Sequence, residues 1–369
     1  MSKNLLLAVL IITTVFYSCK KTQQTETGGT NPPAATTFQG KGGIYYLGTA
    51  DIPVNNTAYA NTNLAGVVIR FKWESLETAP NVFNWSYIDG EIAKAKANNK
   101  KVSLQVLGYP MWVITSLGAS SYNYIDKNTN HTTYLDTLKD VLSWDNIYLS
   151  RVTNLINKFA EKYATDTTVA YFNLIGGQIS RGLPDSVITA AGSKAFWTEF
   201  SYNADTVIAK MKPVLDLYMT KFPKTALWCS VDYVSFETKA SGKANNYLCS
   251  QFVTYGITNY PDRFGCWRED LSACNPQPNI QTTNQWYTMY QNNTRTGAQM
   301  LWSVQDGPNR MNKCGIVPNT RQVVLDSSIN NGLRLGMRYF EIYGADIQDA
   351  TLTANIASYN AILKAKYPY

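Results

Sequence analysis

The sequence predicts a single (β/α)8 barrel behind an export signal, and three observations support the barrel. From residue 43 onward, short apolar runs alternate with longer amphipathic stretches. Eight such strand–helix units fit within residues 42–369, which is a usual size for one barrel of this class. The apolar runs are nearly continuous, as expected for parallel strands that are buried on both faces.

The apolar runs define the strands. The eight predicted strands cover residues 43–48, 66–73, 101–109, 169–177, 225–234, 263–270, 297–307 and 337–347. An open doubly wound sheet is the main alternative. That fold usually carries a glycine-rich phosphate loop after an early strand, and this sequence has no such pattern.

Helical periodicity fills the intervals between the strands. The predicted helices cover residues 85–100, 145–166, 196–222, 246–255, 321–336 and 352–366. The clearest of them places Leu149, Val152 and Leu155 on one face and begins at Asp145 or Asn146, both good N-cap residues. Long inserts at 112–144 and 271–296 follow the third and sixth strands. Both inserts should rise over the C-terminal mouth of the barrel.

Residues 1–19 resemble an export signal. A basic head precedes an apolar run from Leu5 to Phe16, which is too short to span a membrane. The small residue before Cys19 resembles a bacterial lipoprotein processing site. This resemblance implies a lipid on Cys19 and a membrane-anchored protein of the cell envelope, with the outer membrane favoured. An ordinary signal with a chance cysteine is the alternative. Residues 20–41, rich in Thr, Gly and Pro, predict a flexible tether to the barrel at 42–369.

Five cysteines follow Cys19. Export permits disulfides, and the odd number leaves at least one thiol unpaired. The first expected pair is Cys266–Cys274, which would close a short loop. Free buried thiols remain the alternative.

Composition narrows the ligand class. The net charge is +7, but the basic residues are scattered, so a nucleic-acid partner is not expected. The single histidine, His131, argues against a histidine base or a histidine-rich metal site, and no cofactor or metal is expected. The 25 tyrosines and 9 tryptophans suit either a ligand that stacks on rings, such as a sugar, or simply a large core. The sequence does not indicate an oligomeric state.

Three segments carry a family resemblance. They are RFKWESLE with FNWSYID (70–77 and 83–89), the helix and strand at 148–173, and DRFG at 262–265. They resemble corresponding parts of clan A glycoside hydrolases, the last one being similar to β-galactosidase-like members. The resemblance implies a (β/α)8 barrel that acts on an oligo- or polysaccharide.

The resemblance also implies two catalytic glutamates, at the ends of the fourth and seventh strands and ~5–5.5 Å apart in retaining enzymes. In this sequence Gln178 and Gln305 occupy the two candidate places. An amide has no proton to give at neutral pH and no charge with which to attack. A non-catalytic carbohydrate-binding barrel is therefore the alternative to a hydrolase, and a structural or adhesive lipoprotein without a sugar site is a third.

Other carboxylates could supply the chemistry. Glu341, Asp306 and Asp232 are the predicted catalytic residues, and Glu341 is favoured because a carboxylate in an apolar strand needs a partner when buried. Arg70 and Arg181 could pair with Glu341, or either could hold an acidic sugar. The aromatic residues near strand ends, Tyr233 among them, favour a stacking platform. The predicted substrate-binding residues are Trp73, Tyr109, Trp112, Gln178, Arg181, Trp267, Glu269, Trp302, Gln305 and Tyr343.

Overall fold

The computed structural model divides the chain into two units, 1–36 and 37–369. It describes residues 40–126, 132–173, 198–231, 242–277, 289, 291, 295–305 and 308–367. All described residues belong to the second unit. The predicted signal, Cys19 and nearly all of the predicted tether lie outside them, as does His131.

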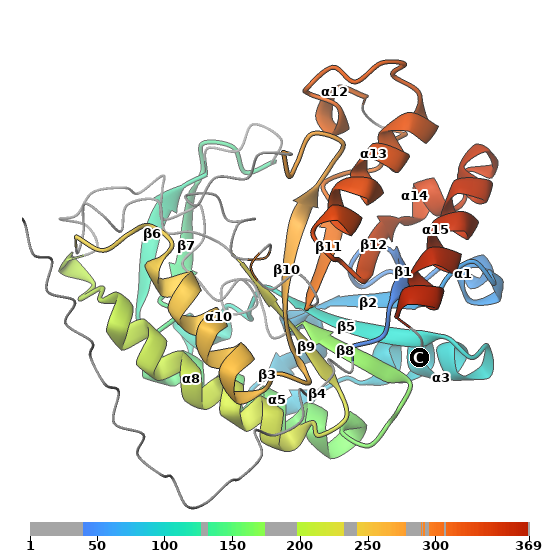
Figure 1. Ribbon diagram of the computed structural model, residues 1–369. Coiled ribbons are helices and arrows are strands. Elements are labelled where there is room, and N and C mark those ends of the chain that lie inside the picture. Colours follow the sequence, from blue (N-terminus) through green and yellow to red (C-terminus); the bar gives the residue numbers. More distant parts are fainter. Residues whose placement is uncertain are drawn as a thin grey trace, which may run out of the picture. The chain divides into compact units, whose positions relative to one another are not determined.

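Eight parallel strands close into a barrel (Figure 1), which confirms the predicted fold class. In ring order they are β1 (Gly43–Leu47), β2 (Gly66–Lys72), β5 (Lys101–Leu107), β8 (Val169–Asn173), β9 (Ala226–Ser230), β10 (Phe264–Leu271), β11 (Thr296–Met300) and β12 (Tyr339–Tyr343). β12 pairs with β1 and closes the ring, so the C-terminal ends of all eight strands meet at one mouth.

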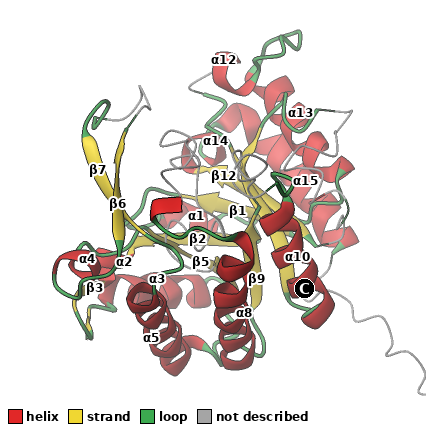
Figure 2. Ribbon diagram, turned by 90° about the vertical axis from the view of Figure 1, so that its left-hand side faces the viewer, coloured by secondary structure: helices red, strands yellow, loops and turns green. Residues whose placement is uncertain are grey.

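Helices surround the barrel (Figure 2). The longer ones are α3 (Ser86–Ala97), α5 (Asn146–Tyr163), α8 (Ala204–Lys221), α10 (Tyr247–Asn259), α13 (Arg321–Arg334) and α15 (Thr353–Lys366). The short ones are α1 (Asn56–Ala60), α2 (Trp73–Leu76), α4 (Trp112–Thr115), α12 (Pro308–Met311), α14 (Gly344–Ile347) and the 3-10 turn Ala350–Leu352. α8 contacts both α5 and α10. α5 begins at the predicted cap, since the Asp145 carboxylate accepts a hydrogen bond from the Tyr148 amide at 3.0 Å.

Several boundaries differ from the prediction. The eighth strand stops at Tyr343, because the chain turns into α14 at Gly344 instead of continuing to 347. Gly344 lies so close to Tyr46 that an added Cβ would stand 2.3 Å from the phenol oxygen. The helix predicted from 196 begins at Ala204, because Asn203 accepts hydrogen bonds from the amides of the first turn.

The insert after the third barrel strand contains an unpredicted hairpin. Its strands are β6 (Ser121–Ile125) and β7 (Thr137–Val141), paired antiparallel. A smaller hairpin, β3 (Glu77–Ala79) with β4 (Val82–Phe83), follows α2. Both hairpins lie outside the barrel sheet. No helix in the described part of the chain is long and apolar enough to cross a membrane.

The predicted disulfide Cys266–Cys274 is wrong. Cys274 pairs with Cys314, which lies 40 residues further along the chain and follows α12. Cys266 is a fully buried thiol within β10, in register with Cys229 of β9. Its side chain faces the outer core between barrel and helices, so the strand holds it away from Cys274.

Aromatic rings fill the N-terminal half of the barrel interior. Tyr45, Tyr171, Trp228 and Tyr339 come from four different strands and have no exposed surface. Their ring centroids lie 4.6 Å apart for Tyr45–Tyr339, 4.8 Å for Tyr171–Tyr339 and 4.9 Å for Tyr171–Trp228. We call these four residues the aromatic floor. Any site inside the barrel must lie above it, towards the mouth.

Candidate functional site

Above the aromatic floor the barrel interior becomes polar. Gln105, Asn173, Gln299 and Glu341 are all at most 5% exposed. We call these four residues the polar ring. Gln105 pairs with Asn173 and Gln299 pairs with Glu341 in the strand register, so the two side chains of each pair face the same side of the sheet.

Each member of the polar ring has a buried oxygen that accepts no hydrogen bond from the described part of the chain. These atoms are Gln105 Oε1, Asn173 Oδ1, Gln299 Oε1 and Glu341 Oε2. A buried polar atom without a partner is costly, and such atoms are rare in folded proteins. The ring is therefore suited to a ligand or solvent that brings hydrogen-bond donors, and sugar hydroxyls are donors of that kind.

Glu341 is the member of the ring that can exchange a proton. Burial raises the pKa of its carboxyl from the ordinary value to about 7, and the charge of Glu269 on β10 also raises it. The hydrogen bond of 2.5 Å from the Tyr339 hydroxyl and the charge of Arg70 lower that pKa, but by less than burial raises it. Near neutral pH, Glu341 can therefore exist as either acid or base.

A cavity of about 570 Å³ opens at the mouth, next to β1, β2 and β12. We call it the mouth pocket. Its lining includes Tyr46, Leu47, Arg70, Trp302, Ser303 and Tyr343. The rings of Trp302 and Tyr343 lie 5.8 Å apart, and Trp302 is 38% exposed. The Gln299 amide is 3.4 Å from the Tyr343 hydroxyl, which connects the polar ring to the pocket.

The loop that carries Trp302 is tied to α14. The Asp346 carboxylate accepts hydrogen bonds from the Ser303 hydroxyl at 2.7 Å and from the Val304 amide at 3.0 Å. Burial raises the pKa of Asp346, and these hydrogen bonds oppose the rise. This carboxylate positions the loop, and both of its oxygens accept hydrogen bonds from the chain itself.

Gln305 belongs to the same loop. Its amide donates to the Ala345 carbonyl of α14. The residue of the seventh strand that faces the barrel interior is instead Gln299, which the sequence analysis did not select. The sequence signal that could have identified Gln299 was the alternation of Gly297 and Gln299 along β11, since residues two apart in a strand share a face. The interior position on strand seven thus carries an amide at Gln299, whereas the prediction placed it at Gln305.

Two of the predicted aromatic ligands, Trp302 and Tyr343, meet at the mouth pocket. Trp73 does not reach it, contrary to prediction. It opens α2 in the outer core with no exposed surface, and its indole donates to Glu77 at 2.8 Å. Trp267 is 2% exposed and packs inside the barrel against the aromatic floor.

Tyr109 and Trp112 also hold structural contacts. The Tyr109 hydroxyl accepts from the Val141 amide at 3.0 Å and so fixes the β6–β7 hairpin. Trp112 donates to the Glu77 carbonyl at 3.1 Å, with the Arg151 guanidinium 5.3 Å from its ring centroid. Four other predicted site residues, Gln178, Arg181, Asp232 and Asp306, lie outside the described residues, as does Tyr233.

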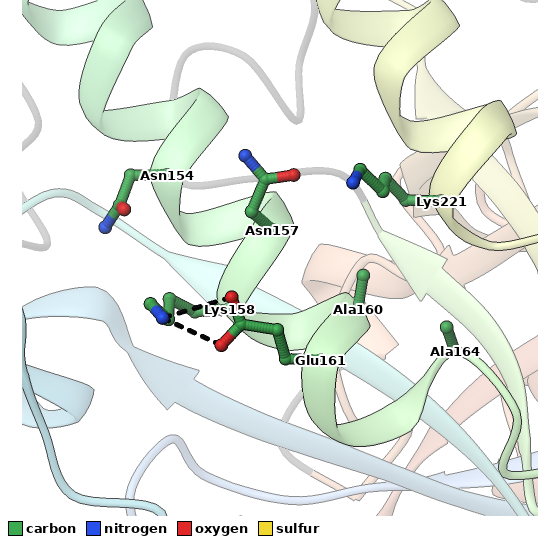
Figure 3. A pocket seen from close by; sticks show the side chains of 7 residues that line it. All are labelled: Asn154, Asn157, Lys158, Ala160, Glu161, Ala164 and Lys221. Atoms are coloured by element: carbon green, nitrogen blue, oxygen red, sulfur yellow. Dashed lines mark hydrogen bonds and ion pairs between the residues drawn. The ribbon is translucent and has the colours of Figure 1, made fainter.

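A second hollow of about 530 Å³ lies on the outside of the barrel, beside α5 and the end of α8 (Figure 3). Its wall includes Asn154, Asn157, the ion pair of Lys158 with Glu161, and Lys221. No aromatic side chain is among its lining residues. The mouth pocket is the stronger candidate, because it contains two aromatic rings and its Tyr343 lies two residues after Glu341 on β12. Within the described segments, no group of three or more His, Cys, Asp or Glu residues could hold a metal ion.

No family model matches the sequence, and no curated protein matches it either. Solved structures do match. The catalytic domain of the β-amylase from Paenibacillus polymyxa has a TM-score of 0.50 at 10% identity, over 90% of this chain and 99% of that one. The chain has the fold of glycoside hydrolase barrels. The cold-adapted β-galactosidase from Rahnella sp. R3 gives a TM-score of 0.52 at 11% identity, over 91% of this chain and 58% of that one. At such identities the similarity establishes the fold alone.

Proposed function

We propose that this protein hydrolyses a glycosidic bond of an oligo- or polysaccharide bound at the mouth pocket, with Glu341 as the acid. The observation that carries the proposal is the fully buried carboxyl of Glu341 on β12, two residues before Tyr343 of the pocket wall, because this burial raises its pKa to about 7. A general acid works best when its pKa lies near the working pH, because it is then protonated and still able to release the proton.

Hydrolysis needs a second carboxylate to act as base or nucleophile. Glu269 on β10 is the described candidate, because its charge acts on both Glu341 and Tyr343. Asp270 beside it is already paired with Arg268 at 2.7 Å. Asp232 and Asp306, which the sequence favours for the same role, stay candidates.

The substrate would stack on Trp302 and Tyr343. Flat rings suit the C–H faces of a pyranose, and Tyr343 adds a hydroxyl for hydrogen bonding. The unpartnered oxygens of the polar ring below would accept hydrogen bonds from the sugar hydroxyls.

A second candidate function is carbohydrate binding without turnover. The observation that favours it is Gln299, an amide directly opposite Glu341 on the strand where retaining enzymes of the resembled clan carry the nucleophile. An amide there can hold a hydroxyl but cannot attack the anomeric carbon.

One experiment separates the two functions. Wild-type protein and Glu341→Gln are screened on a glycan panel for both binding, by calorimetry, and release of reducing ends. A hydrolase should lose about 10²-fold or more in turnover on Glu341→Gln and keep its affinity. A binding protein should show affinity and no turnover in either form. Glu74→Gln is the matched control, because Glu74 is exposed and pairs with Lys72 outside the pocket. If no glycan binds or is cleaved, both functions are rejected.

We also propose that the protein is a lipoprotein of the cell envelope, in the outer membrane, anchored through Cys19. The support is the sequence of residues 1–19, with its apolar run and the small residue before Cys19. Firm anchoring by acyl groups requires more than one chain. Incorporation of a clickable fatty acid should be lost in Cys19→Ala, and the variant should leave the membrane fraction. Membrane retention of an unlabelled wild type would contradict the proposal.

A further inference from the structure

We propose that the mouth pocket selects an acidic sugar, a uronic acid residue, and that Arg70 holds its carboxylate. This inference rests on the proposed carbohydrate site and adds the substrate class. It starts from a cation in the pocket wall that forms no ion pair with the described part of the chain.

Arg70 lies near the C-terminal end of β2, half-buried in the lining of the mouth pocket. Its one hydrogen bond to a described residue is a long one, 3.5 Å from Nη1 to the Gly48 carbonyl. Its Nε atom is buried and has no hydrogen-bond partner among the described residues, and none of their carboxylates lies within ion-pair distance. A guanidinium carries five N–H donors, so most of this group's hydrogen-bonding capacity remains unused.

Several other arginines of the described segments have carboxylate partners. Arg151 pairs with Glu77, Arg268 with Asp270, and Arg321 with Asp349. The charge of Arg70 lowers the pKa of Glu341, but the two groups form no ion pair. The sequence left open whether Arg70 pairs with Glu341 or holds an acidic sugar, and the absence of an ion pair between them favours the second role.

A second cation lies at the same mouth. The Arg310 guanidinium of α12 is 4.2 Å from the centroid of the Trp302 ring. It forms no ion pair with any residue that the structure describes. Arg70 is thus the cation of the pocket wall, and Arg310 packs against the Trp302 ring beside it. A carboxylate matches the planar fork of a guanidinium better than a neutral hydroxymethyl group does, because two parallel charge-assisted hydrogen bonds can form.

The test compares sugars that differ only in the acidic group. Affinities of the wild-type protein for α-1,4-linked galacto-oligosaccharides and α-1,4-linked oligogalacturonates, and for cello-oligosaccharides and β-1,4-linked oligoglucuronates, are measured by calorimetry at low and high salt. We expect at least one uronic oligosaccharide to bind about tenfold or more tightly than its neutral counterpart, since a hydrogen bond to a charged group contributes that much. Added salt should reduce this preference.

Variants assign the preference to Arg70. Arg70→Gln should abolish it and change the affinity for the neutral sugar by less than about threefold, whereas Arg70→Lys should retain part of it. Arg321→Gln is the matched control, because it removes the same charge from an ion pair outside the pocket. Unfolding temperatures verify that each variant is folded.

Three outcomes would overturn the inference. Neutral sugars could bind as tightly as their acidic counterparts, Arg70→Gln could keep the preference, or a sulfated oligosaccharide could equal the uronic one. The proposed carbohydrate site would survive all three results. Failure of every glycan to bind would instead reject the carbohydrate site itself, and this inference with it.

Discussion

The Tyr339 hydroxyl and the Glu341 carboxyl, two residues apart on β12, share a hydrogen bond of 2.5 Å inside the barrel. Residues at this spacing face the same side of a strand, so the tyrosine of the floor reaches up to the acid of the polar ring. The bond favours the ionised carboxylate and burial favours the neutral acid. Burial has the larger effect, which is why the pKa of Glu341 lies at about 7.

The raised pKa of Glu341 predicts a pH-dependent stability. The folded protein holds this proton up to about pH 7, whereas an unfolded glutamate loses it near pH 4.5. The folded state therefore binds more protons between these values, and stability falls as the pH rises through that window. Glu341→Gln should gain up to about 3 kcal/mol relative to wild type between pH 4.5 and pH 8. Urea unfolding at both pH values measures this. A stability difference between Glu341→Gln and wild type that does not vary with pH would refute the raised pKa of Glu341.

Tyr339→Phe should raise the pKa of Glu341 further, by about one unit, because it removes a hydrogen bond to the ionised form. For a hydrolase, the alkaline limb of the pH–rate profile should move upward by the same amount. Tyr343→Phe serves as the control, since Tyr343 bonds to Gln299 rather than to Glu341. An unmoved alkaline limb in Tyr339→Phe would remove Glu341 from the role of acid.

The structure separates two tryptophans that the sequence grouped together. Trp302→Ala should weaken glycan binding about tenfold and leave stability nearly unchanged, because the ring is partly exposed at the pocket. Trp73→Ala should instead destabilise the fold by about 3–5 kcal/mol, as expected for a fully buried ring. Calorimetry and chemical denaturation of both variants test the contrast. Equal effects of the two substitutions on binding would contradict it.

Glu77 organises the outer face below α2. This fully buried carboxylate accepts from Trp73 at 2.8 Å and from the Asn81 amide at 2.8 Å, and it pairs with Arg151. Glu77→Ala should cost about 3–5 kcal/mol of unfolding free energy, since it leaves Arg151 largely buried without its partner. Glu74→Ala, three residues earlier and exposed, should cost less than about 1 kcal/mol. Equal losses of unfolding free energy in the two variants would show that the buried Glu77–Arg151 pair contributes no more to stability than the exposed Glu74 does.

The Cys274–Cys314 disulfide should be found by peptide mapping of the non-reduced protein, and Cys266 should react with an alkylating agent only after unfolding. Replacing both cysteines of the pair by serine should lower stability by about 3–4 kcal/mol, because the bond closes a loop of 40 residues. A mapped Cys266–Cys274 peptide would overturn the observed pairing.

The barrel could be predicted because each of its strands is an apolar run between helical stretches. Hydrophobic periodicity specifies such elements locally, and ring closure then follows from the number of units. The end of the eighth strand could not be found this way. Phe340, Ile342 and Ile347 read as one apolar segment, whereas the close approach of Gly344 to Tyr46 bends the chain into a helix.

The site was only partly predictable, for a related reason. The sequence can place an aromatic residue near the end of a strand, but it does not indicate whether the chain then turns towards the mouth or towards the outer core. Trp302 turns towards the mouth, and Trp73 turns into the outer core. Glu341 could be selected as a functional residue, because a carboxylate within an apolar strand is unusual at any position along that strand. Gln299 was missed, because a glutamine in a strand does not indicate a functional site until its pairing with Glu341 in the strand register is known. Pairing of Cys274 with Cys314 likewise depends on proximity in space.

The four packed rings beneath Glu341 fill the N-terminal end of the barrel interior. A polysaccharide strand thus cannot thread through from top to bottom, and anything admitted must depart through the same opening. A site with a single opening favours binding of a chain terminus or a side branch over sliding along a continuous polymer.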